Sequence, residues 1–221
     1  MSLLGTLQAL EAARTRSGEG EEAVIDYAFE LTGSHLPPNY PAALDAAIVG
    51  VLPWALKDPF FGIHAIKAPL TEAGYVLSRR SRLQIRAFAS RAEDVSGLQG
   101  KTLTCGDASV TVGKMVHRPV TAFPTLRAQM VVNALADEQV FMDDVGMQLE
   151  VLGIKGGVMC GMPASVQGDS GLLNGFAVVL HELSPAHSLR LQTVGLGGAR
   201  RLGCGLFVHH KVIEGPDAWP E

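Results

Sequence analysis

Hydrophobic and polar positions alternate with period two, or recur at helical spacing, along most of the chain. This pattern predicts strands at residues 23–31, 62–68, 83–89, 101–104, 109–112, 115–120, 126–132, 157–162, 175–182 and 202–212. It predicts helices at residues 42–51, 93–98, 137–152 and 184–194. The order is strand, helix, strand, strand, helix, strand, and then much the same again.

This order is that of the split βαβ unit, used twice. It predicts an α+β fold with two tandem ferredoxin-like (RRM-type) domains and antiparallel sheets. We expect a flexible leader at residues 1–22, because its second half is polar and carries like charges. An N-terminal domain at residues 23–122 and a C-terminal domain at residues 123–221 follow.

Composition excludes a disordered or fibrous chain, because 47% of the 221 residues are hydrophobic and 18% are charged. The net charge of −4 gives no sign of a nucleic-acid partner. The distribution of the charges changes this picture. Residues 73–92 hold five arginines and no acid, whereas residues 137–150 hold five acids and no base. Such segregation is compatible with an RNA-binding face.

The cysteines and the N-terminal residues indicate the cellular compartment of the protein. Cys105, Cys160 and Cys204 are widely spaced and odd in number, so they predict buried thiols in a reducing compartment rather than a disulfide framework. The first residues lack the pattern of a signal peptide, and no apolar run approaches about 18 residues. We therefore expect a cytoplasmic protein with no membrane partner.

A glycine-rich segment at residues 195–205 lies between the last predicted helix and the last predicted strand. Glycine lets backbone amides approach an anion closely, and guanidinium groups add phosphate contacts. A dinucleotide fingerprint is excluded, because it needs a strand before the glycines and a helix after them. A tight connection packed against the sheet is the alternative. The candidate binding residues are Gly195, Gly197, Gly198, Arg200, Arg201, Gly203 and Gly205.

A second basic cluster extends from Arg79 to Arg86. Strand alternation places Arg82, Gln84 and Arg86 on one face, opposite Leu83 and Ile85. A basic sheet face suits a phosphate backbone, although an ordinary solvated edge strand has the same pattern.

The seven histidines form no spacing typical of a metal site, so we expect no metal and no cofactor. His35 is the histidine most suited to meet a ligand, because it lies in the loop between the first strand and the first helix. Tyr40 follows at the start of that helix.

Several ordered segments resemble the CRISPR-associated endoribonucleases that process repeat RNA, members of the RAMP superfamily with a C-terminal glycine-rich loop. Beside the loop itself, the matching segments are Leu36-Pro37, Leu52-Pro53-Trp54, Gly62-Ile63-His64, Leu77-Ser78-Arg79-Arg80-Ser81-Arg82-Leu83, Ser188-Leu189-Arg190-Leu191-Gln192 and Gly203-Cys204-Gly205-Leu206-Phe207-Val208. Together they span residues 23–213.

The resemblance implies the two-domain fold and metal-independent cleavage of a repeat hairpin in precursor CRISPR RNA. A base deprotonates the ribose 2′-hydroxyl, which attacks the adjacent phosphorus and leaves a 2′,3′-cyclic phosphate and a 5′-hydroxyl. The implied partners are the repeat hairpin, the mature guide RNA and other CRISPR effector subunits, with no direct contact to DNA.

The chain departs from this family at the start of the first helix, where many members carry a histidine and this sequence carries Tyr40. We expect His35 to act as base or acid with Tyr40 as its helper, and His64 is the reserve candidate. The residues expected to hold the RNA are Arg79, Arg80, Arg82, Arg86, Arg200, Arg201, Lys211 and the glycines of the loop. Two alternatives stay open: a non-cleaving RNA-binding subunit of an effector complex, and a phosphate or nucleotide binder that uses the glycine-rich loop.

Overall fold

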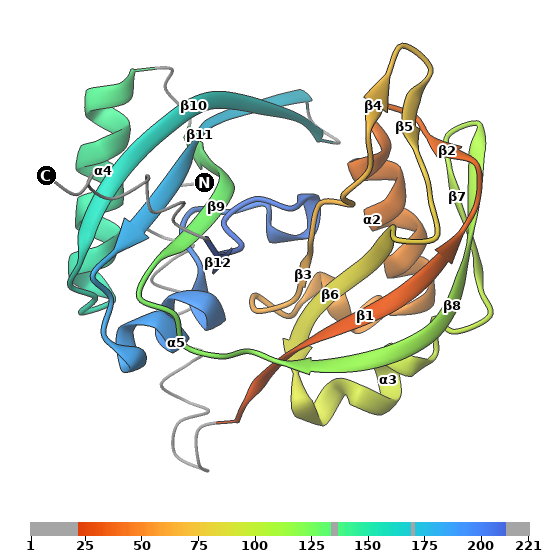
Figure 1. Cartoon of the computed structure of the whole chain (residues 1–221), viewed down its shortest axis with the longest axis horizontal. Coiled ribbons are helices and arrows are strands. Elements are labelled where there is room, and N and C mark those ends of the chain that lie inside the picture. The colour runs from red at the N-terminus through yellow and green to blue at the C-terminus, as the bar shows by residue number, and fades with distance from the viewer. Residues whose placement is uncertain (1–21, 134–136, 169–170, 211–221) are drawn as a thin grey trace, which may run out of the picture.

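The computed structural model describes residues 22–133, 137–168 and 171–210, and Figure 1 shows two halves side by side. The strands are β1 (Val24–Thr32), β2 (His35–Leu36), β3 (Gly62–Ile63), β4 (Leu70–Thr71), β5 (Gly74–Val76), β6 (Arg82–Phe88), β7 (Thr102–Cys105), β8 (Ala108–Pro119), β9 (Leu126–Asn133), β10 (Gly157–Gly168), β11 (Gly171–His181) and β12 (Val208–His209). The helices are α2 (Tyr40–Val51), α3 (Ala92–Ser96), α4 (Glu138–Val151) and α5 (Pro185–Val194), with the 3-10 turns η2 (Pro53–Leu56), η3 (Ala89–Arg91) and η4 (Arg200–Leu202).

The sheet of the first half has five strands in the order β3-β6-β1-β8-β7, and every pairing is antiparallel. Alternation places Tyr27, Leu83 and Ile85 on one face, where all three are fully buried. Ile48 of α2 and Val95 of α3 belong to the same core cluster. The helices therefore cover this face, and the polar residues of the same strands lie on the opposite face.

The sheet of the second half has four strands in the order β10-β11-β9-β12, again antiparallel. Helices α4 and α5 pack their apolar side chains against it. Both helices begin at an N-cap side chain: Asp137 accepts from the amide of Val140, and Ser184 accepts from the amide of His187. The mixed architecture with antiparallel sheets agrees with the predicted α+β class.

Residues of the first half pack into the core of the second half. Phe60 and Phe88 come from the first half, but they belong to the core cluster of the second half. Their rings lie 5.0 Å apart, edge to face. A boundary near residue 122 therefore separates two sheets but does not separate two independent cores.

Several predicted elements differ from the structure. The strand expected at residues 62–68 is confined to Gly62–Ile63. Of the strand expected at residues 202–212, the part up to residue 210 contains only Val208–His209 as strand, and residues 211–212 lie outside the described residues. Gly203 and Gly205 cause the second difference, because both have positive φ (+88° and +65°) and bend the chain where a strand was expected. Two other predicted strands form one, β8. The expected leader lies outside the described residues apart from Glu22, whose carboxylate accepts from the amide of Ser90.

Candidate functional site

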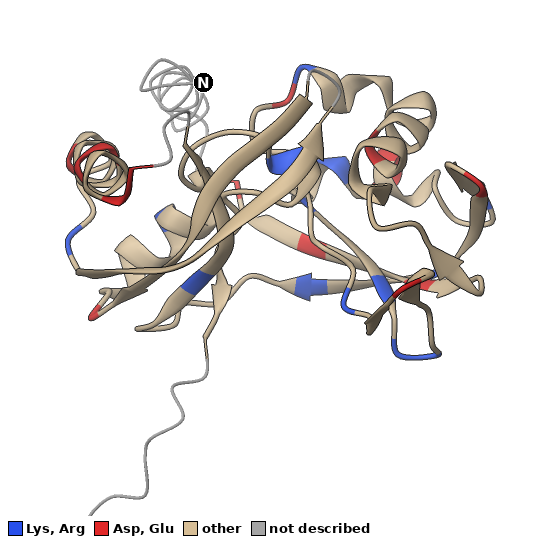
Figure 2. Ribbon diagram, turned by 90° about the horizontal axis from the view of Figure 1, so that it is seen from above, with Lys and Arg blue, Asp and Glu red and all other residues tan. Residues whose placement is uncertain are grey.

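A cleft of about 670 Å³ lies between the two halves. Strands β1, β6 and β8 supply one wall, and β9, β12 and α5 supply part of the other. Its described lining contains a single acid, Asp26, and the following lysine and arginines: Lys67, Arg80, Arg82, Arg86 and Arg118. Figure 2 shows this segregation: blue segments follow the sheet of the first half, whereas the acids of α4 lie at the far left. The cleft therefore suits a polyanion.

The floor of the cleft is a row of residues that the strand register places side by side. Arg86 lies opposite Gly62 on one side and Asp26 on the other, and Arg118 lies opposite Asp26. Arg86 donates two hydrogen bonds to Asp26, from Nε to Oδ1 at 2.7 Å and from Nη2 to Oδ2 at 2.8 Å. This bidentate geometry fixes the Asp26 carboxylate at the centre of the row.

His64 lies directly after β3, and its ring contacts the same carboxylate. Its Nε2 is 3.2 Å from Asp26 Oδ1, and its amide donates to the carbonyl of Gln84. Burial lowers the pKa of His64, and the charge of Arg86 adds to this lowering, although the Asp26 hydrogen bond opposes it. The imidazole is therefore neutral near pH ~7.

The protonation state of Asp26 decides which nitrogen of His64 is basic. Burial alone would raise the pKa of Asp26, but the hydrogen bonds from His64 and Arg86 hold that pKa well below its usual range. An ionised carboxylate can only accept, so Nε2 of His64 carries the proton and donates to Asp26. Nδ1 is left as an unprotonated nitrogen, which is the form a general base requires.

His64 also lines a small pocket of about 10 Å³, together with Tyr40 and Arg201. The Tyr40 hydroxyl accepts from the amide of Ile66 at 2.8 Å. Burial raises the pKa of Tyr40 to about 12. The phenol therefore stays protonated and is suited to donate a hydrogen bond or a proton, not to take one.

The structure does not bring His35 to this site. His35 lies on β2, which pairs with β5 in a separate three-stranded sheet, and its Nδ1 is 3.0 Å from the hydroxyl of its neighbour Ser34. His35 is not among the described residues that line the cleft. From the sequence, His35 is the expected partner of Tyr40 and His64 is the reserve candidate, whereas the structure places His64 beside Tyr40.

The arginines of the β6 cluster have different surroundings. Arg80 and Arg82 line the cleft, whereas Arg79 is exposed and its carbonyl accepts from Arg82 Nη1. Arg86 is only 1% exposed. The expectation that Arg86 grips RNA phosphates is thus corrected: its guanidinium holds Asp26 and the backbone of the second half. Lys211 lies outside the described residues.

The glycine-rich loop contacts the protein rather than offering its amides outward. The amides of Gly195, Gly203 and Gly205 donate to the carbonyls of Leu191, Arg200 and Met130. The amide of Gly197 donates to Gln148 Oε1, and Gly198 is buried. These four amides are therefore not free to cradle a phosphate in the way the sequence predicts.

Arg200 of this loop is buried as well, so the expectation that it binds RNA is corrected. It donates to the carbonyl of Val194 at 2.8 Å and to that of Phe60, in the first half, at 3.0 Å. Burial, followed by the charge of Arg86, lowers its pKa to about 9, so it stays charged near pH ~7. Arg201 is partly exposed, with Nη2 3.6 Å from Asp45.

Sequence reasoning missed several residues of the cleft. Asp26 interrupts a hydrophobic strand, but only its pairing with Arg86 shows its role, and the two are 60 residues apart in the chain. The other residues that the cleft adds to the prediction are Lys67, Gln84, Arg118, Phe123, Gln192 and His209.

No group of three or more histidine, cysteine, aspartate or glutamate side chains among the described residues is arranged to hold a metal ion. No helix in the described ranges is both long and apolar enough to span a membrane.

Solved structures with this fold define its class. A Cas6-related protein from Pyrococcus furiosus superposes with a TM-score of 0.63 at 15% identity, covering 86% of this chain and 99% of that one. A RAMP protein described as binding different RNA substrates gives 0.63 at 17% identity, covering 83% and 98%. The fold is therefore that of Cas6 and RAMP proteins.

Sequence comparison identifies the family. The family model described as Cas6 Crispr matches residues 25–212. The CRISPR-associated endonuclease Cas6 of Myxococcus xanthus is 26% identical over 185 residues, which cover 83% of this chain and 80% of that protein. This chain belongs to the Cas6 family.

Proposed function

We propose that this protein is a metal-independent endoribonuclease that binds and cleaves the repeat hairpin of precursor CRISPR RNA. Family membership and the basic cleft support an RNA substrate. The observation that carries the proposal is the His64–Asp26 pair on the floor of that cleft. A neutral imidazole fixed by a carboxylate beside four partly or fully exposed cations, Lys67, Arg80, Arg82 and Arg118, is suited to proton transfer near a phosphate.

In the proposed reaction, Nδ1 of His64 takes the proton of a ribose 2′-hydroxyl. The 2′-oxygen then forms a bond to phosphorus as the bond from phosphorus to the 5′-oxygen breaks, giving a 2′,3′-cyclic phosphate. Asp26 stabilises the imidazolium that forms. The cations of the cleft stabilise the charge that develops on the phosphate.

The departing 5′-oxygen needs a proton to leave as a hydroxyl. Tyr40 is the group in the small pocket that stays protonated at neutral pH, and it lies beside His64. We assign it the role of donor to that oxygen. His35 is then dispensable for the chemical step.

The test is incubation of the pure protein with labelled repeat RNA in EDTA. We expect cleavage at one position, with a 5′-hydroxyl on one product and a cyclic phosphate on the other. Cleavage that EDTA abolishes would contradict the metal-free mechanism, and a 3′-hydroxyl product would contradict attack by the 2′-oxygen.

A second candidate function is that of a repeat-RNA-binding subunit that does not cleave. Tyr40 favours it, because this residue begins α2 where many relatives carry a histidine. The same assay separates the two functions: intact RNA under conditions of tight binding supports the non-cleaving subunit and contradicts the endonuclease.

A further inference from the structure

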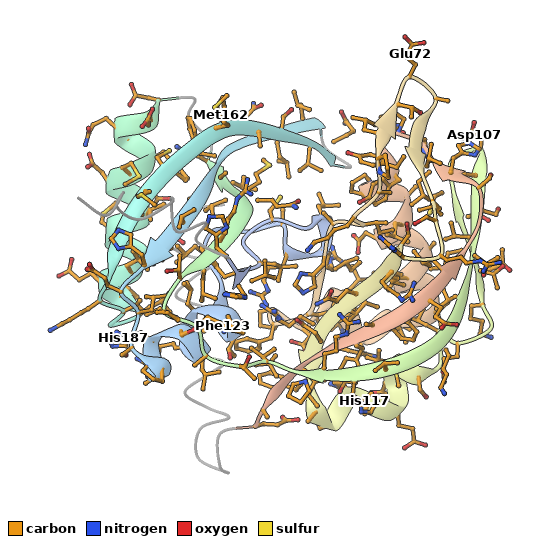
Figure 3. All side chains as sticks on the ribbon, in the orientation of Figure 1. Glu72, Asp107, His117, Phe123, Met162 and His187 are labelled. Carbon is orange, nitrogen blue, oxygen red and sulfur yellow. The ribbon has the colours of Figure 1, made fainter. Side chains whose placement is uncertain are left out.

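Two rings stack against each other where the cleft meets the second half. The rings of Phe123 and His209 have centroids 3.9 Å apart and planes inclined by only 12°. Both residues line the cleft. Figure 3 labels Phe123, which lies on the segment that connects β8 to β9 and so joins the two halves.

The inner ring of this pair is held firmly. Phe123 is partly buried and packs against the core cluster of the second half. Its amide donates to the hydroxyl of Ser188 at 2.9 Å, and Ser188 is fully buried. The connecting segment is therefore fixed at the position of this ring.

The outer ring is also fixed but open to solvent. His209 pairs with Leu126 in the register of β12 with β9, and the next amide, of His210, donates to the carbonyl of Thr125. The side chain of His209 is exposed. Phe123 covers one face of its imidazole, so the other face is open to a planar ligand in the cleft.

We propose that Phe123 and His209 form a stacking platform for one unpaired base of the bound RNA. This inference rests on the proposed function and specifies its substrate: RNA with a single-stranded nucleotide next to the hairpin stem. A base inside a stem already has neighbours on both faces, whereas an unpaired base has a free face. Stacking on a ring that is already ordered costs little conformational entropy.

The charges around the platform suit this ligand. Arg118 is exposed at the end of β8, five positions before Phe123, and lines the same cleft. A phosphate held by Arg118 would bring its base to the platform, and Arg118 lies opposite Asp26 of the floor in the pairing of β8 with β1. The platform would thus set which nucleotide reaches His64. Stacking accepts any of the four bases, so we expect a preference for an unpaired nucleotide rather than for a particular base.

The test compares two synthetic repeat RNAs, one with both single-stranded flanks and one trimmed to the stem-loop, each with a 2′-deoxy sugar at the mapped cleavage position. We expect His209→Ala to weaken binding of the flanked RNA about tenfold and to leave the stem-loop unchanged. His209→Phe keeps the stack and should bind like the wild type. His210→Ala is the matched control, because it changes the neighbouring histidine, which is not among the described residues that line the cleft.

An RNA series locates the base. A single abasic nucleotide at the stacked position should weaken binding by the wild type and add nothing to the loss in His209→Ala. Equal losses for both RNAs, or losses in His209→Phe equal to those in His209→Ala, would overturn the platform. Unchanged binding of the flanked RNA by His209→Ala, with a wild type that cleaves the unmodified repeat RNA, would overturn the platform alone. No RNA binding by the wild type would overturn the proposed function with it.

Discussion

Asp26 holds three side chains on the floor of the cleft. Its Oδ1 accepts from His64 and Arg86, and its Oδ2 accepts from Gln84 and Arg86. A buried carboxylate with this many donors stays ionised, and an ionised neighbour keeps the ring of His64 in one tautomer. The orientation and basicity of His64 therefore depend on Asp26, and through it on Arg86.

The lowered pKa of His64 has a measurable effect on stability. A histidine whose pKa is lower in the folded state adds stability above its unfolded pKa of about 6.5, and this stability is lost as the pH falls towards the folded pKa. We expect the free energy of unfolding to fall between pH ~7 and pH ~5, by at most about 1.4 kcal/mol per pH unit from His64. The free energy of unfolding of His64→Gln, measured by urea titration, should fall less steeply over this interval. Equal slopes for both proteins would contradict the burial of a neutral His64.

The sequence predicts the surroundings of a residue only where its interaction partner lies nearby in the chain. The alternation that places Arg82, Gln84 and Arg86 on one face of β6 is correct. It does not distinguish a solvated arginine from a buried one, because that depends on Asp26, 60 residues away. His64 was identified only through its motif, since a lone histidine after a short strand carries no signal of its partner.

At the scale of elements, the glycine-rich loop is a close-packed connection. A Cβ at Gly205 would collide with the carbonyl oxygen of Leu196, and one at Gly195 would collide with that of Gly205. The two ends of the loop therefore touch through their backbones. This contact places Arg200 and Arg201, which lie between them, against the first half.

Replacing Gly205 tests this packing. Gly205 and Gly100 both have positive φ, +65° and +76°, but nothing lies within 4 Å of a Cβ at Gly100. Gly100→Ala should cost about 1 kcal/mol, from backbone strain alone. Gly205→Ala should cost about 1–3 kcal/mol more, because it adds a backbone collision. Equal costs in denaturant titrations would contradict the close contact.

The elements of this fold differ in how far the sequence determines them. Strands β1, β6 and β9 and helices α2, α4 and α5 were predicted, because their apolar periodicity matches the face they bury. The strand expected from residue 202 was predicted wrongly over residues 202–207, because these residues are apolar enough for a strand but contain glycines at positive φ. Apolar pattern alone does not report backbone conformation.

At the scale of the whole molecule, two buried arginines join the halves reciprocally. Arg86 of the first half donates to the carbonyls of Gln192 and Phe207 in the second. Arg200 of the second half donates to the carbonyl of Phe60 in the first. These bonds connect the two halves that form the walls of the cleft. That each half is a ferredoxin-like domain remains our proposal.

The basic lining of the cleft should determine the salt dependence of RNA binding. Each phosphate contact that is lost lowers the slope of log K against log salt by about 1. We expect Arg118→Ala to weaken binding and lower this slope by about 1. Lys101→Ala is the control, because Lys101 is exposed beside β7 and does not line the cleft. An unchanged slope for Arg118→Ala, or equal changes for both variants, would place the RNA elsewhere.

The sequence predicted the segregation of charge in the whole molecule, but not the cleft. The sequence alone shows five arginines within residues 73–92. The cleft needs Lys67 and Arg118. Arg118 joins this cluster through the pairing of β1 with β6 and β8, and Lys67 follows β3, which pairs with β6.

Single-turnover cleavage of repeat RNA in EDTA tests the central claim, that the His64–Asp26 pair in the cleft performs the chemistry. We expect His64→Ala to lower the rate about a hundredfold or more while RNA binding is kept, the loss that removal of a general base produces. His35→Ala should cleave at nearly the wild-type rate. A normal rate for His64→Ala, or a loss confined to His35→Ala, would contradict the account.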